Sequence, residues 1–247
     1  MIKLETVRDF PIEVQQLIEY KIHDLKIENV QVKNYLRSER RYWCGFDTPV
    51  KDSLRSELKQ LLINESFECY HCTKVINPNE IVLNGLHVLK TSDLKNRVLK
   101  TIGPYINDNQ RKYFIECFDS YVDGSLGIRE KMIWFVPNLK EVDDQGCELF
   151  FEYYGGEITR RLLYDRKDEF YPILKQLGSP IIVQCSVRFS ELSQNHFLNF
   201  INSFLDMVIR NTDNIGWEFY LEGNLLPDKI IRIIDKKNTV LNFSKTT

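Results

Sequence analysis

The chain has no run of about 18 apolar residues, so its sequence offers no membrane-spanning helix. Residues 1–5 carry charges where a secretory signal would need an apolar block. Internal repeats and low-complexity linkers are also lacking. These absences predict a soluble protein of the cytoplasm with no membrane partner.

The six cysteines show neither a disulfide framework nor a complete metal-binding pattern. Cys69 and Cys72 form a C-x-x-C around His71, but no second pair of ligands accompanies them. Alternation along a strand would also send these two side chains to opposite faces. We therefore expect reduced thiols and no metal site.

A large charge of either sign is absent too, since the net charge is -2. This balance gives no bulk attraction to nucleic acid, although a local basic groove stays compatible with it. The 43% apolar and 12% aromatic content excludes a disordered chain, and 247 residues are enough for a sizeable core. Basic and aromatic residues gather at 33–43, where we expect a solvated face with one aromatic docked on the core.

Hydrophobic periodicity predicts an α+β protein, with a helical extension at residues 1–65 and a mixed domain at 66–247. Periodic segments indicate helices, and short apolar or alternating segments indicate strands. The expected helices cover residues 10–22, 53–62, 91–102, 107–119 and 197–210; the expected strands cover 131–136, 180–187, 216–223 and 230–234; and a turn is expected at 123–127.

One stretch places reactive side chains at a clear junction. Tyr70-His71-Cys72-Thr73 predicts a strand that carries an imidazole and a hydroxyl to its end. A loop and a short helix follow, and Gly85-Leu86 ends that helix. This layout resembles the first strand of the diphtheria-toxin-like ADP-ribosyltransferases, in the H-Y-E branch that includes the poly(ADP-ribose) polymerases.

Three later segments extend the resemblance over about residues 66–236. Ile133-Trp134-Phe135 matches the family's second strand, with Trp134 at a position usually held by Tyr. Tyr153-Tyr154 stands for a further Tyr, and Glu218-Phe219-Tyr220 for the Glu-Tyr segment near the C-terminus. The resemblance implies a split, mixed or antiparallel sheet and an NAD site without metal.

The chemistry of that family needs these residue types. Cleavage of the bond between nicotinamide and ribose passes through an oxocarbenium-like state that a carboxylate stabilises. Imidazole and hydroxyl groups orient ribose, and aromatic faces stack on the nicotinamide ring. The resemblance implies catalytic roles for Glu218, His71 and Tyr154, and NAD contacts for His71, Thr73, Gly85, Trp134, Tyr153 and Tyr154.

Two other carboxylates compete with Glu218. Glu222 lies on the same face of the same predicted strand. Glu157 follows Gly155-Gly156, a backbone able to approach a ligand closely, although Arg160 or Arg161 stands at ordinary ion-pair spacing from it.

The sequence thus predicts an NAD-dependent ADP-ribosyltransferase or NAD glycohydrolase, with NAD as substrate and a protein or nucleic acid as unidentified acceptor. One alternative is an RNA 2′-phosphotransferase-like enzyme that uses Arg160, Arg161 and Arg188. Another is a non-catalytic binding protein on the same fold, which the replacement of Tyr by Trp134 favours.

Overall fold

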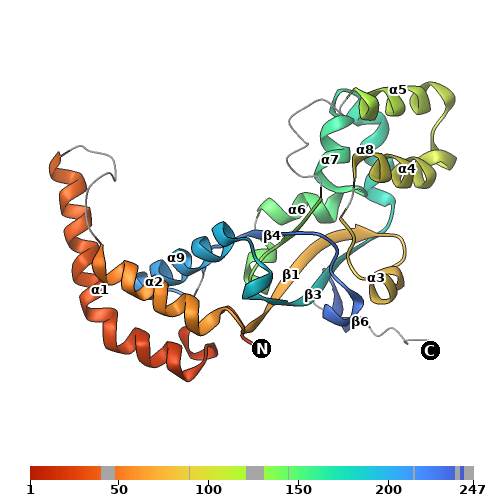
Figure 1. Cartoon of the computed structure of the whole chain (residues 1–247). Helices are drawn as coiled ribbons and strands as arrows, with labels where there is room; N and C mark the ends of the chain where they lie inside the picture. Colours follow the sequence, from red (N-terminus) through yellow and green to blue (C-terminus); the bar gives the residue numbers. More distant parts are fainter. Residues whose placement is uncertain are drawn as a thin grey trace. The chain divides into compact units, whose positions relative to one another are not determined.

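The computed structural model describes residues 1–39, 48–88, 90–120, 131–143, 145–213, 215–236 and 240–241. Helices and small sheets combine in an α+β fold, as predicted (Figure 1). The chain forms two compact units, the first from residues 1–68 and 187–217 and the second from 69–186 and 218–247. The predicted boundary at residue 65 lies close to the first junction, but the sequence did not indicate that 187–217 belong to the first unit.

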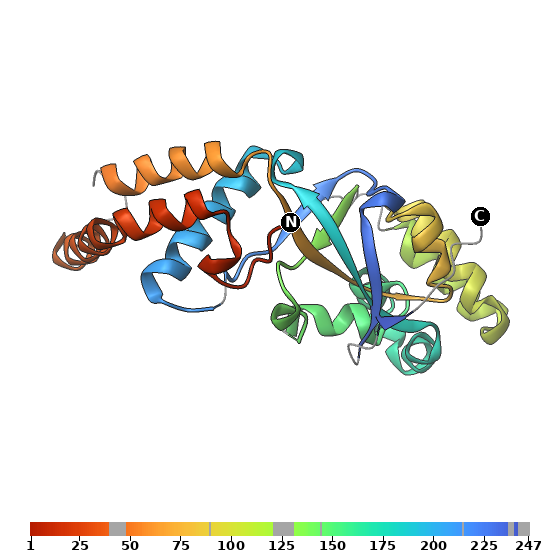
Figure 2. The same cartoon turned by 90° about the horizontal axis from the view of Figure 1, so that it is seen from below.

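Three helices build the first unit: α1 (Ile12–Glu39), α2 (Pro49–Leu62) and α9 (Gln194–Arg210). Each contacts the other two (Figure 2). Short 3-10 turns η1 (Val7–Asp9) and η6 (Phe189–Glu191) accompany them. Helix α1 continues well beyond the apolar stripe predicted from Ile12 to Ile22. The end of the expected basic and aromatic cluster, residues 40–43, lies outside the described residues.

The start of α2 is fixed by a buried carboxylate. Glu28 accepts hydrogen bonds from the backbone N–H groups of Val50 and Lys51, at 2.9 and 3.0 Å. These N–H groups belong to the first turn, where a helix leaves its donors unpaired. The buried stripe of α2, Leu54, Leu58 and Leu62, keeps the four-residue spacing of one helix face.

The second unit contains a sheet with the strand order β1 (Ser66–Val75), β3 (Ser179–Arg188), β5 (Ile230–Asp235) and β6 (Val240–Leu241). Strands β1 and β3 continue into the first unit at one end. A separate antiparallel ribbon joins β2 (Met132–Phe135) to β4 (Phe219–Glu222). Within the described residues, one isolated antiparallel bridge, between Tyr70 and Val136, links the sheet to the ribbon.

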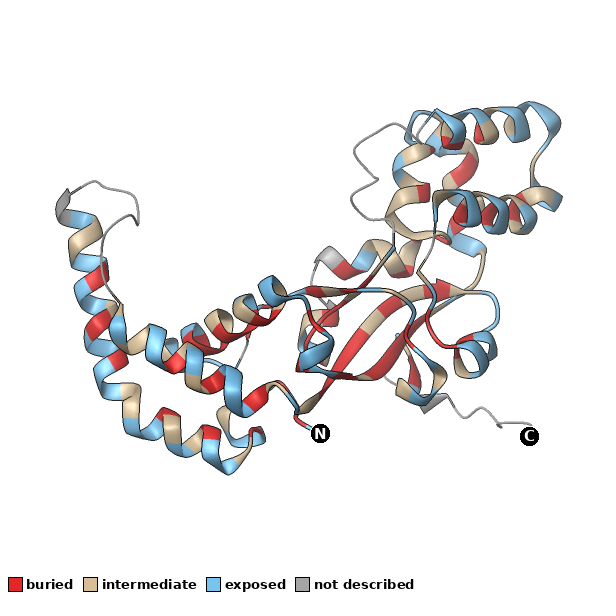
Figure 3. Ribbon diagram, viewed as in Figure 1, coloured by how far each residue is buried: buried red, intermediate tan, exposed pale blue. Residues whose placement is uncertain are grey.

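The second unit also contains six helices among its described residues, and several of them form a helical layer with its own core. They are α3 (Asn79–Asn84), α4 (Thr91–Ile102), α5 (Asp108–Asp119), α6 (Gln145–Glu152), α7 (Gly156–Leu162) and α8 (Lys167–Gln176), with the 3-10 turns η2 (Gly103–Tyr105), η4 (Leu139–Asp143), η5 (Tyr164–Arg166) and η7 (Pro227–Lys229). Helices α4, α5 and α8 share an apolar core, while α6 packs on β1. Figure 3 shows that β1 and β3 are largely buried.

Several predicted elements are confirmed. Helix α4 has the predicted bounds, and α5 begins after Asn107, whose side chain and that of Gln110 each accept a hydrogen bond from the other's backbone N–H. The turn expected at 123–127 lies outside the described residues. None of the helices in the described ranges is both long and apolar enough to cross a membrane.

Candidate functional site

The site begins where β1 and β2 part. Tyr70 and Val136 exchange two backbone hydrogen bonds, each 2.9 Å long. Continued pairing would next place Cys72 opposite Trp134. Instead, Nδ1 of His71 lies 2.9 Å from the carbonyl oxygen of Trp134. The imidazole therefore bonds a strand carbonyl at the point where the two sheets separate.

This contact also defines the protonation of His71. A carbonyl oxygen can only accept, so Nδ1 carries the proton. Burial lowers the pKa of His71 below its ordinary value of 6.5, partly opposed by the bond to Trp134. The ring is therefore neutral at pH 7, and Nε2 keeps a lone pair that can accept a hydrogen bond.

A pocket of about 310 Å³ opens at the split. Strands β1 and β2 form one wall, α6 and α7 contribute another, and Glu218 stands just before β4. The lining residues are Tyr70, His71, Cys72, Trp134, Phe135, Val136, Cys147, Leu149, Phe150, Glu157 and Glu218.

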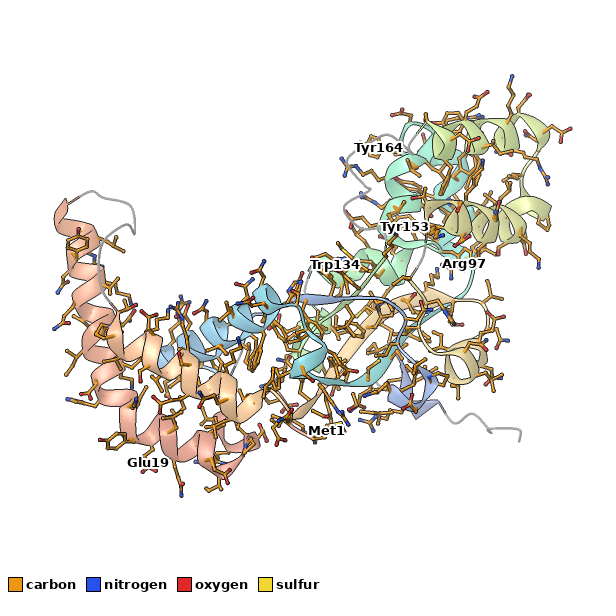
Figure 4. All side chains as sticks on the ribbon, in the orientation of Figure 1. Met1, Glu19, Arg97, Trp134, Tyr153 and Tyr164 are labelled. Carbon is orange, nitrogen blue, oxygen red and sulfur yellow. The ribbon has the colours of Figure 1, made fainter. Side chains whose placement is uncertain are left out.

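A second pocket of about 170 Å³ adjoins the first. Five lining residues belong to both: His71, Cys72, Trp134, Phe150 and Glu157. Beyond these shared residues, the second pocket extends to the first turns of α4, and Figure 4 labels Arg97 on that helix and Trp134 on β2. We call the two pockets together the split-sheet site.

Opposite charges mark the two ends of the split-sheet site. Glu218 lines the larger pocket only, whereas Lys90 and Arg97 line the smaller pocket only. Glu157, in the first turn of α7, lies on the shared wall. A ligand that spans the site would thus meet the Glu218 carboxylate at one end and the two cations at the other.

The structure brings some of the candidate carboxylates to the site. Glu218 is exposed and Glu157 is half-buried, and both line the larger pocket. Glu222 lies opposite Met132 in the β2–β4 ribbon and is not among the described residues that line either pocket. The predicted alternation of this segment holds, since Trp217, Phe219 and Leu221 are all buried.

The two tyrosines lie elsewhere. Tyr153 and Tyr154 are buried in the core of the helical layer with α4, α5 and α8. The Tyr154 hydroxyl accepts a hydrogen bond from Thr101, at 3.3 Å, and the Tyr153 ring is 4.8 Å from that of Tyr171. Neither is among the described residues that line the split-sheet site, so the structure does not bring them to His71.

Phe150 lines both pockets in their place. It lies on α6 beside Phe151, which is buried against β1. The sequence showed a cluster of aromatics here, but selecting Phe150 required the phase of α6 relative to the sheet. If residues 145–152 are taken as a helix, Phe150 and Phe151 point about 100° apart, so only one of them can face the core directly.

Of the remaining predicted residues, Thr73 lines the smaller pocket, while Gly85 does not. Gly85 has a φ of 81°, and a Cβ there would lie 2.0 Å from the carbonyl oxygen of Leu225. The next residue, Leu86, pairs with Leu225 through backbone bonds of 2.9 and 2.8 Å. Gly85 therefore allows the backbone at Leu225 to approach closely, which a residue with a Cβ would prevent.

The arginines of the phosphotransferase alternative do not gather here. The Arg160 guanidinium lies 5.8 Å from the centre of the Tyr153 ring, and Arg188 belongs to the first unit. In the described part of the chain, no group of three or more His, Cys, Asp or Glu side chains is placed to hold a metal ion. Cys69 directs its Sγ to the carbonyl of Cys185, while Cys72 packs under α6.

A scan against models of protein families, a search of curated proteins and a search of solved structures each gave no match.

Proposed function

We propose that the protein cleaves the bond between nicotinamide and ribose in NAD and transfers ADP-ribose to an acceptor or to water. The observation that carries this proposal is the polarity of the split-sheet site, with Glu218 at one end and Lys90 and Arg97 at the other. NAD has the matching polarity, because its nicotinamide ring is cationic and its diphosphate is anionic. The charges on ligand and site then attract at both ends.

The shared wall suits the nicotinamide riboside. Trp134 and Phe150 offer aromatic faces on which the nicotinamide ring can stack. Nε2 of neutral His71 accepts a hydrogen bond from a ribose hydroxyl. Lys90 and Arg97 would hold the diphosphate beside the N-terminus of α4, where backbone N–H groups also favour an anion.

Bond cleavage then requires a carboxylate. Nicotinamide leaves with the electron pair of the glycosidic bond, and C1′ of the ribose develops positive charge. Glu218 stabilises this charge and orients the ribose hydroxyls, and the nucleophile then forms the new bond to C1′. Glu157 lines the same pocket and is the other candidate for this role.

The test is nicotinamide release from NAD by the full chain. Replacing Glu218 by Gln keeps the size and removes the charge, so release should fall about a hundredfold or more. Glu222→Gln is the matched control, since it removes the same charge from the adjoining strand β4 but from a residue outside the site. Equal activity in wild type, Glu218→Gln and Glu157→Gln would overturn the proposal.

Binding is measured on the same samples. NAD should raise the thermal midpoint of the wild type and of Glu218→Gln, because a ligand that binds only the folded state stabilises it. A shift without nicotinamide release from the wild type would instead identify a protein that binds NAD without turnover.

A further inference from the structure

The helical layer of the second unit presents a row of cations without carboxylate partners. Lys90, Arg97, Lys100 and Arg111 form no ion pair with any residue in the described ranges. Two other cations of the same helices are paired, Lys95 with Asp119 at 2.5 Å and Lys112 with Glu116 at 3.9 Å. On α4 and α5, the cations without an ion pair are thus those that line the smaller pocket or a neighbouring hollow.

These cations lead away from the split-sheet site. Lys90 and Arg97 line its smaller pocket. Lys100 is one turn further along α4, and with Arg111 of α5 it lines an open hollow of about 510 Å³. Arg97 and Lys100 thus connect the proposed NAD site to the hollow.

A glycine lines the hollow, and an exposed aromatic residue follows it in the chain. A Cβ on Gly103 would lie 3.3 Å from Nη2 of Arg111, so the bare glycine leaves room for the guanidinium. Two residues later in η2, Tyr105 is 61% exposed. Cations that track a backbone beside an exposed aromatic ring are the features that bind single-stranded nucleic acid.

We infer that Lys100 and Arg111, at the end of the row outside the split-sheet site, bind single-stranded nucleic acid together with Tyr105. Phosphates lie on the cations and an unstacked base lies on Tyr105, which a duplex with stacked bases could not supply. The acidic residues of these two helices, Asp93 and Asp108, lie in the first turns, where a negative charge stabilises the N-terminus of a helix. The idea that the bound strand accepts ADP-ribose rests on the proposed function. Binding of the strand does not depend on that function.

Fluorescence anisotropy without NAD tests the surface. The ligand is a labelled oligothymidine or oligouridine of about a dozen nucleotides, within the range that such surfaces cover. Lys100→Gln with Arg111→Gln should weaken binding about tenfold and reduce the salt slope by about 1.4, for two lost phosphate contacts. Lys95→Gln with Lys112→Gln is the matched control, since it removes equal charge from the same helices, and should leave binding within about twofold.

Tyr105→Ala separates base stacking from charge. It should weaken single-strand binding about tenfold, whereas Tyr164→Ala, at another exposed tyrosine of the second unit, should not. An unchanged affinity in Tyr105→Ala would overturn the inference, because no base would then stack on this ring. Equal competition by polyglutamate would also overturn it and would favour an acidic protein as the partner. Absence of binding to the oligonucleotide would also overturn it, whether or not NAD is cleaved.

Transfer to the strand is measured separately with NAD present. Strand binding with no NAD cleavage would support the inferred nucleic-acid surface and contradict the proposed function. NAD cleavage with no strand binding would support the proposed function and contradict the inferred surface.

Discussion

Nδ1 of His71 donates a hydrogen bond to the carbonyl oxygen of Trp134 across 2.9 Å, at the place where β1 and β2 stop pairing. A side chain thus satisfies a carbonyl that the ladder would otherwise bond. The same bond fixes the ring and leaves Nε2 as its acceptor. One residue therefore supports the split in the sheet and supplies a polar group for the pocket that the split creates.

The lowered pKa of His71 makes stability depend on pH. Between its lowered folded value and 6.5, the unfolded chain binds more protons than the folded chain. The contribution is fully present above pH 6.5 and is lost as the pH falls toward the folded value. Urea unfolding should show a steeper loss of stability on acidification for wild type than for His71→Gln; parallel pH profiles would contradict this assignment.

Phe150 should matter for NAD binding more than Tyr154 does. Phe150→Ala removes a ring that lines both pockets, and NAD affinity should fall about tenfold. Tyr154→Phe removes only a hydroxyl bonded to Thr101 in the helical core, so affinity should be unchanged. Titration calorimetry of both variants checks this, and a larger loss of affinity in Tyr154→Phe would give the Tyr154 hydroxyl a role in the site.

Lys74 should contribute strongly to stability. Its Nζ donates to the carbonyl oxygens of Glu152 and Leu174, at 3.1 and 3.3 Å, and to that of Lys175, at the C-terminal ends of α6 and α8. Lys74→Met leaves these carbonyls without the donor and should lower the free energy of unfolding by about 3 kcal/mol. Lys175→Met, which breaks a surface ion pair with Glu152, should cost less than about 1 kcal/mol in the same urea experiment.

Gly85→Ala should destabilise the chain by about 3 kcal/mol, because it adds a Cβ against the Leu225 carbonyl at a positive φ. Gly216 also has a positive φ, of 57°, but no atom lies within 4 Å of a Cβ built there. Gly216→Ala should therefore cost only about 1 kcal/mol. Thermal unfolding of the two variants separates steric overlap from backbone strain, and equal costs would remove the role given to Gly85.

Local signals predicted much of the secondary structure. The bounds of α4 and the alternating Trp217, Phe219 and Leu221 each depend on neighbours in sequence, and the structure agrees with both. The full length of α1 was missed because its long exposed face adds polar residues that weaken the apolar period.

The candidate site was predicted in part. His71 and Trp134 lie within β1 and β2, and Glu218 directly precedes β4, so strand pairing fixes which residues meet; β1 continues to Val75 instead of ending at His71 as expected. Phe150 and Arg97 lie on helices whose rotation about their own axes is set by packing against distant residues. A single sequence does not encode that rotation in any local pattern, and so the tyrosines of the same cluster were selected instead.

The chain passes between its two units three times, after residues 68, 186 and 217. No uninterrupted fragment therefore contains one unit and excludes the other. A protein truncated to begin at residue 66 would keep α9 but lose α1 and α2, exposing the rings of Phe197, Phe200 and Phe204 to water. Such a fragment would aggregate during purification, and a failed assay on it would report the missing helices instead of the chemistry of the remaining residues.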